Sequence, residues 1–312
     1  MTTSVALCTY NGERYIREQL ESILNQTMHV DEIVVCDDRS TDNTLQVIET
    51  IASTTDIKIN VFRNESQLGV CYNFQKAIDI CKGEIIFLSD QDDVWEPNKV
   101  ETIISYFNDN KSIQAVFTDA LLIDQDGNPD KIIPNNLWSY HFKKKDKKIF
   151  DNGIQLEPFL NGGNHATGAT MAFRKDLVLN RPITNICQYG EVLHDYAIAV
   201  YAAESNALGY IDSPLIRYRI HNGQTCGLIR RSATIDYQMY VINTCVIPYL
   251  KNPQAVEIAK FTSYRLRQTR KVHGWLGMIR NIRKYRQLYN KTALKILCTD
   301  ISTWCKTITG RL

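Results

Sequence analysis

Short apolar runs separated by helical patterns fill the first 120 residues of this chain, and they constrain the fold more than any other feature of the sequence. The runs at residues 5–8, 33–36 and 85–88 are continuous rather than alternating. A strand that is apolar on both faces must be covered on both faces, as in a parallel sheet between layers of helices. Parallel neighbours also need long crossover connections, which the helical patterns supply. The sequence therefore predicts an α/β fold built from βαβ units.

The other elements follow from periodicity and from residues that begin or end helices. Further strands are predicted at residues 57–62 and 114–118. Helices are predicted at residues 13–26, 41–50, 70–81 and 97–108. Beyond residue 120 we expect a hairpin turn at 124–129, a loop leading into a strand at 161–174, a helix that begins at His194, and two short strands around a turn within 208–222. From residue 228 onward the pattern is helical.

Carboxylates gather where two of the predicted strands end. Asp37 and Asp38 follow the second strand, and Asp90, Asp92 and Asp93 follow the run that precedes them. Alone, the first pair reads equally well as a helix cap in a solvated turn. Parallel strands, however, end at one edge of the sheet, where ligands bind. Clustered carboxylates repel unless a cation neutralises them, and all-oxygen ligation suits Mg²⁺ or Mn²⁺ better than zinc. The two acidic turns together predict a metal-assisted binding site.

Several classes of protein are disfavoured by what the sequence lacks. No Gly-x-Gly-x-x-Gly follows the first strand and no Gly-x-x-x-x-Gly-Lys-Ser/Thr occurs, which argues against dinucleotide-binding folds and P-loop NTPases. The nine cysteines are irregularly spaced without a Cys-x-x-Cys pair, as in reduced cytoplasmic proteins. A strand begins at residue 4, which leaves no room for a signal peptide, and no apolar run reaches the roughly 18 residues of a membrane span. We expect a cytoplasmic protein.

Four segments, taken in order, resemble the family 2 glycosyltransferases. They are Val5–Gly12, Ile33–Asp42, Asn64–Gly69 and Asp90–Trp95, and the match in order and spacing runs from residue 4 to about 120. The resemblance implies a GT-A-type, mixed and mainly parallel sheet flanked by helices, and a metal-dependent, inverting transfer from a nucleotide sugar. The Asp-Gln-Asp-Asp-Val-Trp form is similar to the bacterial branch that builds surface polysaccharides, such as lipopolysaccharide and capsule, and that includes many rhamnosyltransferases.

The resemblance gives roles to residues at the first two strand ends. Thr9, Tyr10 and Asn11 would line the nucleotide pocket, with the Tyr10 ring packed against a pyrimidine. Asp37 or Asp38 would accept a hydrogen bond from the N3–H of uracil or thymine.

The acidic turn would hold the metal and the sugar-phosphate end of the donor. Asp90 and Asp92 match the family's Asp-x-Asp motif. Asp90 is assigned to the nucleotide, and either Asp92 or Asp93 to the Mg²⁺ or Mn²⁺ ion. His221, in a Tyr-Arg-x-His segment, would complete the metal site or touch the diphosphate.

The second half would supply the base. An inverting transfer needs one carboxylate to take the proton of the acceptor hydroxyl. From the residues alone Asp195 could simply cap a helix, but the resemblance makes it the base, with Glu191 as the alternative. The resemblance assigns Gly168, Glu191, His194 and Arg219 to the acceptor and donor-sugar side, and Arg219 could also touch the diphosphate.

The C-terminal region is strongly basic. Residues 258–299 contain eleven basic residues and no acidic one. Val272, Trp275, Leu276, Ile279 and Ile282 form an apolar stripe at helical spacing. This pattern is typical of a helix lying on an anionic membrane surface, or of one packed on the catalytic domain with its charges in water; RNA binding is disfavoured. The first alternative would place the protein at the inner face of the cell membrane.

We therefore expect a catalytic domain at 1–227, with a nucleotide-binding half at 1–120 and an acceptor half at 121–227, and a helical basic extension at 228–312. The expected activity is transfer from a UDP- or dTDP-sugar, with rhamnose as one candidate, to a saccharide acceptor, expected to be lipid-linked. One alternative is a metal-dependent nucleotidyltransferase, but residues 9–12 lack the basic, Gly-rich loop that it needs. The other, an inactive membrane-surface scaffold, fits poorly with the intact acids. No nucleic acid partner is expected.

Overall fold

The computed structural model describes residues 1–129, 136–137, 155–162, 164, 166–187, 192–224, 234–289 and 293–308, which form two compact units. Unit 1 comprises the described parts of residues 1–147, 166–202 and 207–230. Unit 2 comprises those of residues 148–165, 203–206 and 231–312. Each unit is discontinuous along the sequence. The division into domains after residue 227 stays a prediction.

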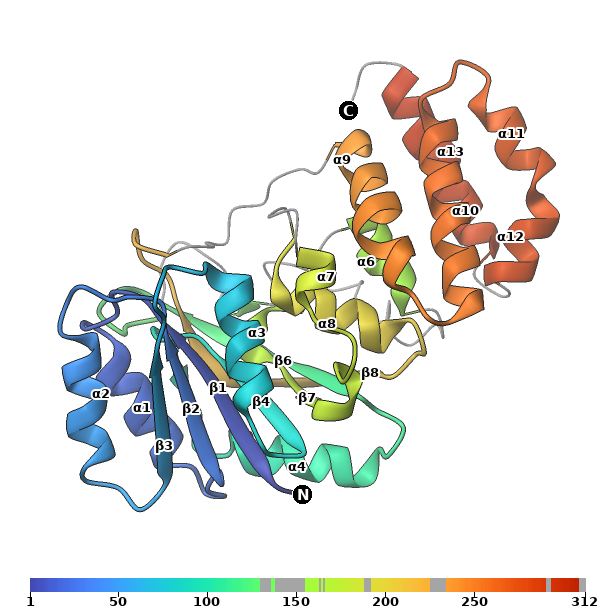
Figure 1. Ribbon diagram of the computed structural model, residues 1–312. Coiled ribbons are helices and arrows are strands. Elements are labelled where there is room, and N and C mark those ends of the chain that lie inside the picture. The colour runs from blue at the N-terminus through green and yellow to red at the C-terminus, as the bar shows by residue number, and fades with distance from the viewer. Residues whose placement is uncertain are drawn as a thin grey trace. The chain divides into compact units, whose positions relative to one another are not determined.

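Unit 1 is organised around a sheet that has eight strands within the described residues (Figure 1). The strands are β1 (Thr3–Thr9), β2 (Glu32–Asp37), β3 (Lys58–Arg63), β4 (Ile85–Ser89), β5 (Val94–Trp95), β6 (Ala115–Ile123), β7 (Ala172–Arg174) and β8 (Leu208–Arg219), in the order β3-β2-β1-β4-β7-β6-β8-β5. β3, β2, β1 and β4 are parallel, as are β6 and β8. β7 is antiparallel to both neighbours, and β5 is antiparallel to β8. This mixed, mainly parallel sheet confirms the predicted fold class.

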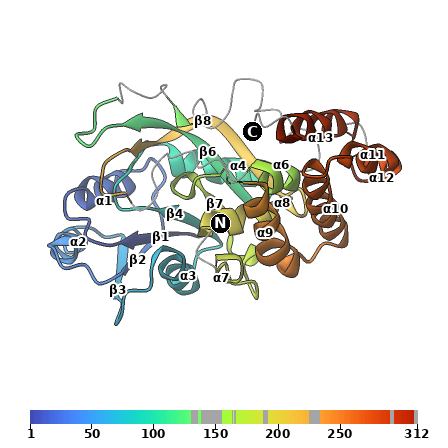
Figure 2. The ribbon, with the colours of Figure 1, turned by 90° about the horizontal axis from the view of Figure 1, so that it is seen from above.

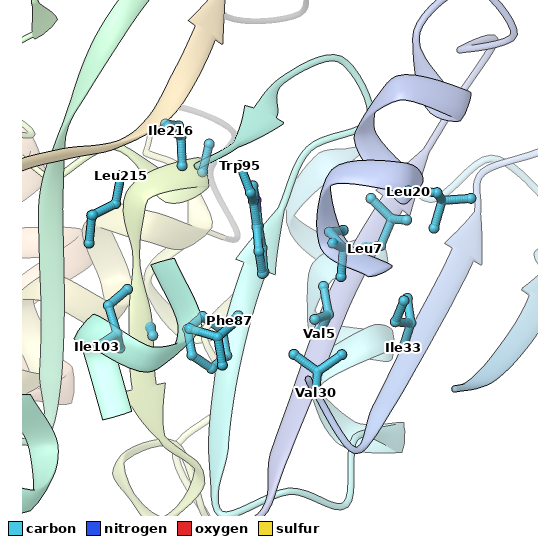
Figure 3. Packing of buried hydrophobic residues seen from close by; sticks show 14 of the residues in the cluster. Val5, Leu7, Leu20, Val30, Ile33, Phe87, Trp95, Ile103, Leu215 and Ile216 are labelled. Carbon is cyan, nitrogen blue, oxygen red and sulfur yellow. The ribbon is translucent and has the colours of Figure 1, made fainter. Parts of the chain in front are cut away.

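Helices cover both faces of the parallel half. Side chains on one face, including Val5, Leu7 and Phe87, pack in one cluster with Leu20 and Ile103 (Figure 3). These last two belong to α1 (Ile16–Leu24) and α4 (Lys99–Asp109), and α2 (Thr44–Ala52) joins the same cluster. α3 (Val70–Ile80) contacts β1 and β2 on the opposite face (Figure 2). All four helices lie within three residues of their predicted bounds, because the apolar spacing that identifies them also creates their buried faces.

The second half of unit 1 is less regular. It contains η2 (Gly168–Thr170), η3 (Lys175–Leu177), α7 (Thr184–Cys187) and α8 (His194–Ala203). The prediction of two short strands within 208–222 is wrong, because β8 runs unbroken from Leu208 to Arg219. Asp212-Ser213-Pro214 suggested a turn, but its pairing with β6 shifts register on either side of Asp119. Such an irregularity accommodates proline without ending the strand.

Unit 2 is helical, as predicted from residue 228 onward. Its elements are α6 (Leu156–Gly162), α9 (Ile235–Tyr240), a π-helical turn η4 (Val241–Val246), η5 (Ile247–Tyr249), α10 (Pro253–Thr269), α11 (Gly274–Arg280), α12 (Ile282–Tyr289) and α13 (Ala293–Ile308). The stripe at 272–282 is divided between α11 and α12, with a tight turn before α11. A Cβ at Gly274 would lie 1.7 Å from the backbone oxygen of Gln268, so only glycine permits this turn.

The basic residues of unit 2 do not all face water. Arg265 is 3% exposed and donates to both carboxylate oxygens of Asp300, at 2.7 and 2.9 Å. It also contacts Glu157 at 2.5 Å and the Tyr289 hydroxyl at 2.6 Å. The burial of Arg265 could not be predicted from the sequence, because its partners on α6 and α13 are far away along the chain.

The apolar stripe itself is largely exposed. Val272 is 66% exposed, Ile279 45%, and Leu276 and Ile282 36% each. The indole N–H of Trp304, on α13, donates to the Lys271 carbonyl at 2.8 Å, and its ring lies 6.5 Å from that of Trp275. Among the helices that the structure describes, none has both the length and the apolar character needed to cross a membrane.

Candidate active site

The ends of β1 and β2 are joined through Asp37. Its carboxylate is fully buried and accepts hydrogen bonds from the Thr9 hydroxyl at 2.9 Å and from the Ser40 N–H at 2.9 Å. The Ser40 hydroxyl donates to the same carboxylate and also accepts from the Asn11 N–H at 2.9 Å. Three of the predicted nucleotide-binding residues, Thr9, Asn11 and Asp37, thus belong to one hydrogen-bonded turn.

Asp38 holds the loop that leads into α3. Its side chain is 4% exposed and accepts from the Asn64 amide at 2.8 Å and from the N–H groups of Leu68 and Gly69 at 2.7 and 2.8 Å. Gly69 has φ +79°, which a residue with a side chain rarely adopts. A carboxylate has further lone pairs, so a contact from Asp37 or Asp38 to a base stays a prediction.

A side-chain amide joins the first turn to the acidic turn. The Tyr10 N–H donates to Gln91 Oε1 at 2.8 Å, and Gln91 Nε2 donates back to the Tyr10 carbonyl at 3.0 Å. A Cβ at Gly12 would lie 2.2 Å from the same Gln91 oxygen, so glycine permits the approach. The Tyr10 side chain stays 45% exposed, available to a flat ligand. The pairing of Gln91 with this turn was not predicted from the sequence, because the two segments are 81 residues apart.

Burial and neighbouring carboxylates disfavour the ionised forms of Asp90 and Asp93. Burial, with a contribution from Asp92, raises the pKa of Asp90 to about 6. The Asp93 side chain is 1% exposed, and burial with Asp92 and Asp90 nearby raises its pKa well above the ordinary value. Its Oδ1 accepts from the Arg219 N–H at 3.0 Å, while Oδ2 is buried without a hydrogen-bond partner.

Asp92 pairs with His221. The Asp92 Oδ2 and His221 Nε2 atoms are 2.8 Å apart, and both side chains are mostly buried. Among the described residues no group of three or more His, Cys, Asp or Glu side chains is arranged to hold a metal ion. Proteins commonly bind Mg²⁺ through one or two carboxylates while substrate phosphates and water fill the other positions. The Asp92 carboxylate and the His221 ring nitrogen, which lie side by side, fit such a partial site.

Arg219 serves the acidic turn rather than facing solvent. It is 1% exposed, donates from Nε to the Asp92 carbonyl at 2.7 Å, and forms an ion pair with Glu18 at 2.5 Å. Its guanidinium also lies over the Tyr15 ring, 4.8 Å from the centroid. Arg219 therefore fixes the backbone beside Asp92, and a direct contact to diphosphate stays a prediction.

A buried lysine, missed in the sequence, faces the acids. Lys99 is fully buried, and its Nζ donates to the Ala169 carbonyl at 2.8 Å and lies 4.0 Å from the centroid of the Trp95 ring. Burial lowers the pKa of Lys99 to about 7, although Asp93 and Asp90 oppose this. Nothing local in the sequence indicates that a lysine at the start of α4 is buried.

Asp195 lies in the first turn of α8. It is 7% exposed; its Oδ2 accepts from the Gly168 N–H at 3.1 Å and its Oδ1 from the Tyr196 N–H at 2.7 Å. A Cβ on Gly168 would lie 2.7 Å from His194 Nε2 and 3.4 Å from Asp195 Cβ, so Gly168 allows η2 to approach α8. Asp195 also raises the pKa of Asp90, which places the two acids in one electrostatic site.

His194, the residue before Asp195, packs against α3. Its ring is 4% exposed and stacks on Phe74 with centroids 3.8 Å apart, and neither ring nitrogen makes a hydrogen bond of ordinary geometry. Burial favours the neutral ring, but the Cys71 thiol, Asp195 and Asp90 outweigh it and raise the pKa of His194. The alternative base, Glu191, lies outside the described residues.

The comparisons with known proteins agree with this geometry. Residues 4–176 match the model of Glycosyl transferase family 2. The chain belongs to that family. An uncharacterized glycosyltransferase of Haemophilus influenzae is 28% identical over 230 residues, which cover 71% of this chain and 66% of the relative. The dTDP-rhamnosyl transferase RfbG of Shigella flexneri is 28% identical over 238 residues, which cover 71% of this chain and 73% of the relative.

A solved structure shares the fold of this family 2 chain. TarS 1-349 of S. aureus, in complex with UDP-GlcNAc, has a TM-score of 0.54 at 16% sequence identity, over 98% of this chain and 79% of that one. The match confirms the predicted GT-A-type architecture. Of the predicted site residues, the first turn, the acidic turn, His221 and the Asp195 region all belong to unit 1. Their individual roles stay predictions.

Proposed function

We propose that this family 2 chain transfers a sugar, with inversion, from a UDP- or dTDP-sugar to a hydroxyl group of a saccharide acceptor. The observation that carries the proposal is that this family 2 chain holds the acidic turn and Asp195, whose two oxygens accept from the Gly168 and Tyr196 N–H groups, in one unit. One carboxylate near the acceptor and a group of carboxylates near the diphosphate are what such a transfer needs.

The first turn would bind the nucleotide. The exposed Tyr10 ring offers a surface for a pyrimidine, and Gln91 holds its backbone against the acidic turn. Asp37 and Asp38 fix the surrounding loops by accepting their N–H and O–H groups. One of these acids accepts from the base through a remaining lone pair, which would favour uracil or thymine.

Asp92 and His221 would hold a divalent ion, Mg²⁺ or Mn²⁺, with the donor diphosphate completing its coordination. When bound, the ion supplies Lewis-acid stabilisation of the leaving diphosphate. Arg219 keeps the Asp92 backbone in place, and Lys99 partly balances Asp90 and Asp93. We assign Asp92 rather than Asp93 to the ion, because one oxygen of Asp93 is committed to the Arg219 N–H in a fully buried position.

Asp195 would act as the base. The Gly168 and Tyr196 N–H groups fix both of its oxygens, so the carboxylate has one orientation. It takes the proton of the acceptor hydroxyl while that oxygen attacks the anomeric carbon and the nucleotide leaves from the opposite face. His194, the residue before it, is buried against Phe74, and Asp195 is among the groups that raise the pKa of this histidine.

The acceptor is proposed to be lipid-linked, in surface polysaccharide synthesis, and the RfbG relative makes dTDP-rhamnose a donor to test first. The exposed side chains of the stripe lie among exposed basic residues such as Lys271, Arg280 and Arg283. Anionic lipid attracts each basic residue near its surface by about 1 kcal/mol. We propose that this face of unit 2 lies on an anionic membrane.

A donor panel tests the proposed function. UDP-, dTDP- and GDP-sugars, including dTDP-rhamnose, are assayed for hydrolysis and for transfer with Mn²⁺, with and without chelator. Activity that survives both chelator and Asp92→Ala would contradict the role of the ion.

The membrane contact needs a separate assay. Co-sedimentation with phosphatidylglycerol vesicles compares the full chain with Leu276→Ser/Ile279→Ser, and Val272→Ile, which keeps the apolar surface, is the control. Binding that the serine variant retains would exclude the stripe as the membrane contact.

A further inference from the structure

Two cysteines, Cys71 on α3 and Cys187 on α7, form a second candidate reactive group close to the proposed base. Gln75 of α3 accepts a hydrogen bond from the Ile183 N–H at 2.7 Å. Cys71 is one turn before Gln75 on α3, and Cys187 is one turn after Ile183, at the end of α7. Both views place the two helices side by side (Figures 1 and 2). The contact between Gln75 and Ile183 therefore aligns the two cysteines.

The sulfur of Cys71 is the accessible member of the pair. Cys71 is partly exposed, whereas Cys187 is 2% exposed. Cys71 Sγ lies 3.8 Å from the Val192 carbonyl oxygen. A hydrogen bond from the Cys187 thiol lowers the pKa of Cys71 to about 5; burial opposes this and His194 adds to it. Its place in the first turn of an eleven-residue helix also favours the thiolate.

His194 is an independent observation that points to the same sulfur. Its ring is 4% exposed and stacks on Phe74, one turn along α3 from Cys71. Both ring nitrogens are buried without a hydrogen bond of ordinary geometry, which is costly unless a charge partner lies nearby. The Cys71 sulfur is one such partner, together with Asp195 and Asp90. Because His194 is adjacent to Asp195 in sequence, its ring links the Cys71 sulfur to the proposed base.

We propose that Cys71 and Cys187 form a reversible thiol–disulfide pair that switches the transfer site off under oxidation by peroxide. The transfer part of this inference rests on the proposed function, but the cysteine chemistry does not.

Forming the disulfide is a two-electron oxidation, and the peroxide is the oxidant. The Cys71 thiolate attacks one peroxide oxygen, the O–O bond breaks, and hydroxide leaves, which gives a sulfenic acid at Cys71. The Cys187 sulfur then attacks the sulfenic sulfur, the S–O bond breaks, and the hydroxyl departs as water with the Cys187 proton. Two thiols lose two electrons and two protons in total, and one peroxide is reduced to two waters. A dithiol reductant reverses the change.

Oxidation reaches the base through His194. A disulfide has no negative charge, so the pKa of His194 loses one of the groups that raise it. Closing the disulfide also draws α3 toward α7 and shifts Phe74, which supports the His194 ring beside Asp195. We expect the transfer rate to fall at least tenfold and to recover with dithiothreitol.

Peptide mapping tests the thiol chemistry without any activity. The full chain is treated with hydrogen peroxide at pH 7, alkylated, digested and analysed by mass spectrometry. The expected product is a peptide linked through Cys71 and Cys187, lost after dithiothreitol. In Cys187→Ser the reaction stops at a sulfenic acid trapped by dimedone, while Cys298→Ser, which removes an exposed cysteine of α13, leaves the linkage unchanged. Disulfides that join other cysteines, or no reaction at Cys71, would overturn the proposal.

Alkylation at pH 6 provides a second readout. With a pKa near 5, Cys71 is mostly thiolate at this pH, but a weaker nucleophile than an ordinary thiolate. The two effects together predict labelling by iodoacetamide roughly tenfold faster than that of a reference cysteine peptide. An equal or slower rate would contradict the activated sulfur.

The activity assay compares oxidised with reduced protein within each variant, so basal rates cancel. The wild-type ratio falls at least tenfold, whereas Cys71→Ser and Cys71→Ala give ratios near one. Circular dichroism verifies that each variant is folded. Normal transfer without a linked peptide rejects this inference alone, whereas a linked peptide without transfer from any donor rejects the proposed function alone. A linked peptide that leaves transfer unchanged rejects the switch.

Discussion

The two units each bury charged side chains, but they balance them in opposite ways. In unit 2, Arg265 is surrounded by acceptors: both oxygens of Asp300, one oxygen of Glu157 and the Tyr289 hydroxyl. Tyr285 donates to Asp300 at 2.5 Å. In the described part of unit 2, every buried polar side-chain atom has a hydrogen-bond partner.

Unit 1 leaves its buried charges incompletely paired. Lys99 is the buried cation close to Asp90 and Asp93, and its ammonium donates to a backbone carbonyl rather than to either carboxylate. Asp93 Oδ2 and both nitrogens of His194 have no hydrogen bond of ordinary geometry. The excess of buried acid is what a divalent cation would compensate.

The contrast separates a structural network from a functional one. A buried charge is costly unless it is paired. In unit 2 the ion pairs of Arg265 join α10 to α6 and α13. Unit 1 keeps an imbalance that protonation of the acids or a bound cation would remove. Burial of charge alone therefore does not identify a site, whereas burial without a partner does.

Asp195→Asn should give the largest change in function. Amide and carboxylate have nearly the same shape, but the amide cannot accept the acceptor proton, so the transfer rate should fall about 10³-fold. Calorimetric binding of UDP or dTDP should be unchanged. Near-normal transfer by the variant would show that another group is the base.

Arg265→Met should give the largest change in stability. The variant leaves Asp300 and Glu157 buried without their cation, which costs about 3–5 kcal/mol of unfolding free energy. Urea denaturation followed by circular dichroism measures it. The control is Arg270→Met, because the Arg270–Asp236 pair is exposed and is worth less than about 1 kcal/mol. Equal losses in the two variants would remove the distinction between the networks.

Asp90→Asn should stabilise unit 1 in a pH-dependent way. Burial, with Asp92 and Asp195 nearby, raises the pKa of Asp90 to about 6, above roughly 3.9 in the unfolded chain. Between these values the native state holds more protons, so the unfolding free energy falls as the pH rises through this window. Above pH 6 the ionised carboxylate costs on the order of 2 kcal/mol.

With chelator present, the variant should therefore be more stable than the wild type at pH 7.5, and the difference should mostly disappear by pH 4. Urea midpoints at the two pH values measure this. A variant less stable than the wild type at pH 7.5 would mean that Asp90 is already compensated, as the charges of unit 2 are.

Gly168→Ala should have the smallest effect. The added methyl group meets the His194 ring, which is held by Phe74 and cannot easily move, so Asp195 shifts and transfer falls roughly tenfold. Gly277→Ala in unit 2 is the matched control, because its methyl group meets the flexible end of Gln268. Comparable losses of transfer in both variants would contradict the tight fit around the base.

Local pattern was enough to predict much of the fold. The continuous runs at β1, β2 and β4 require cover on both faces, and the acids that follow β2 and β4 lie at one edge for that reason. β8 was mispredicted because Pro214 signals a turn locally, while pairing with β6 along the whole strand outweighs it.

Contacts between residues that are distant along the chain could not be predicted from the sequence. The Gln91 bridge to Tyr10 spans 81 residues and the contact of Arg265 with Glu157 spans 108, and neither leaves a periodic signal. The burial of Lys99 also depends on distant contacts, because η2 and the Trp95 ring meet its ammonium. The site residues could be named from the sequence, but the groups that orient them could not.

The composition of unit 2 has a consequence for synthesis on the ribosome. α6 carries Glu157, whose partner Arg265 is made about a hundred residues later, and Asp300 later still. While the nascent chain grows, the sheet that begins at β1 can gather its early strands, but α6 has no cation to neutralise it. A chain truncated before α10 would never supply Arg265, so Glu157 on α6 would stay unpaired. Such a shortened chain is expected to bind chaperones and be degraded by proteases rather than to behave as a minimal transferase.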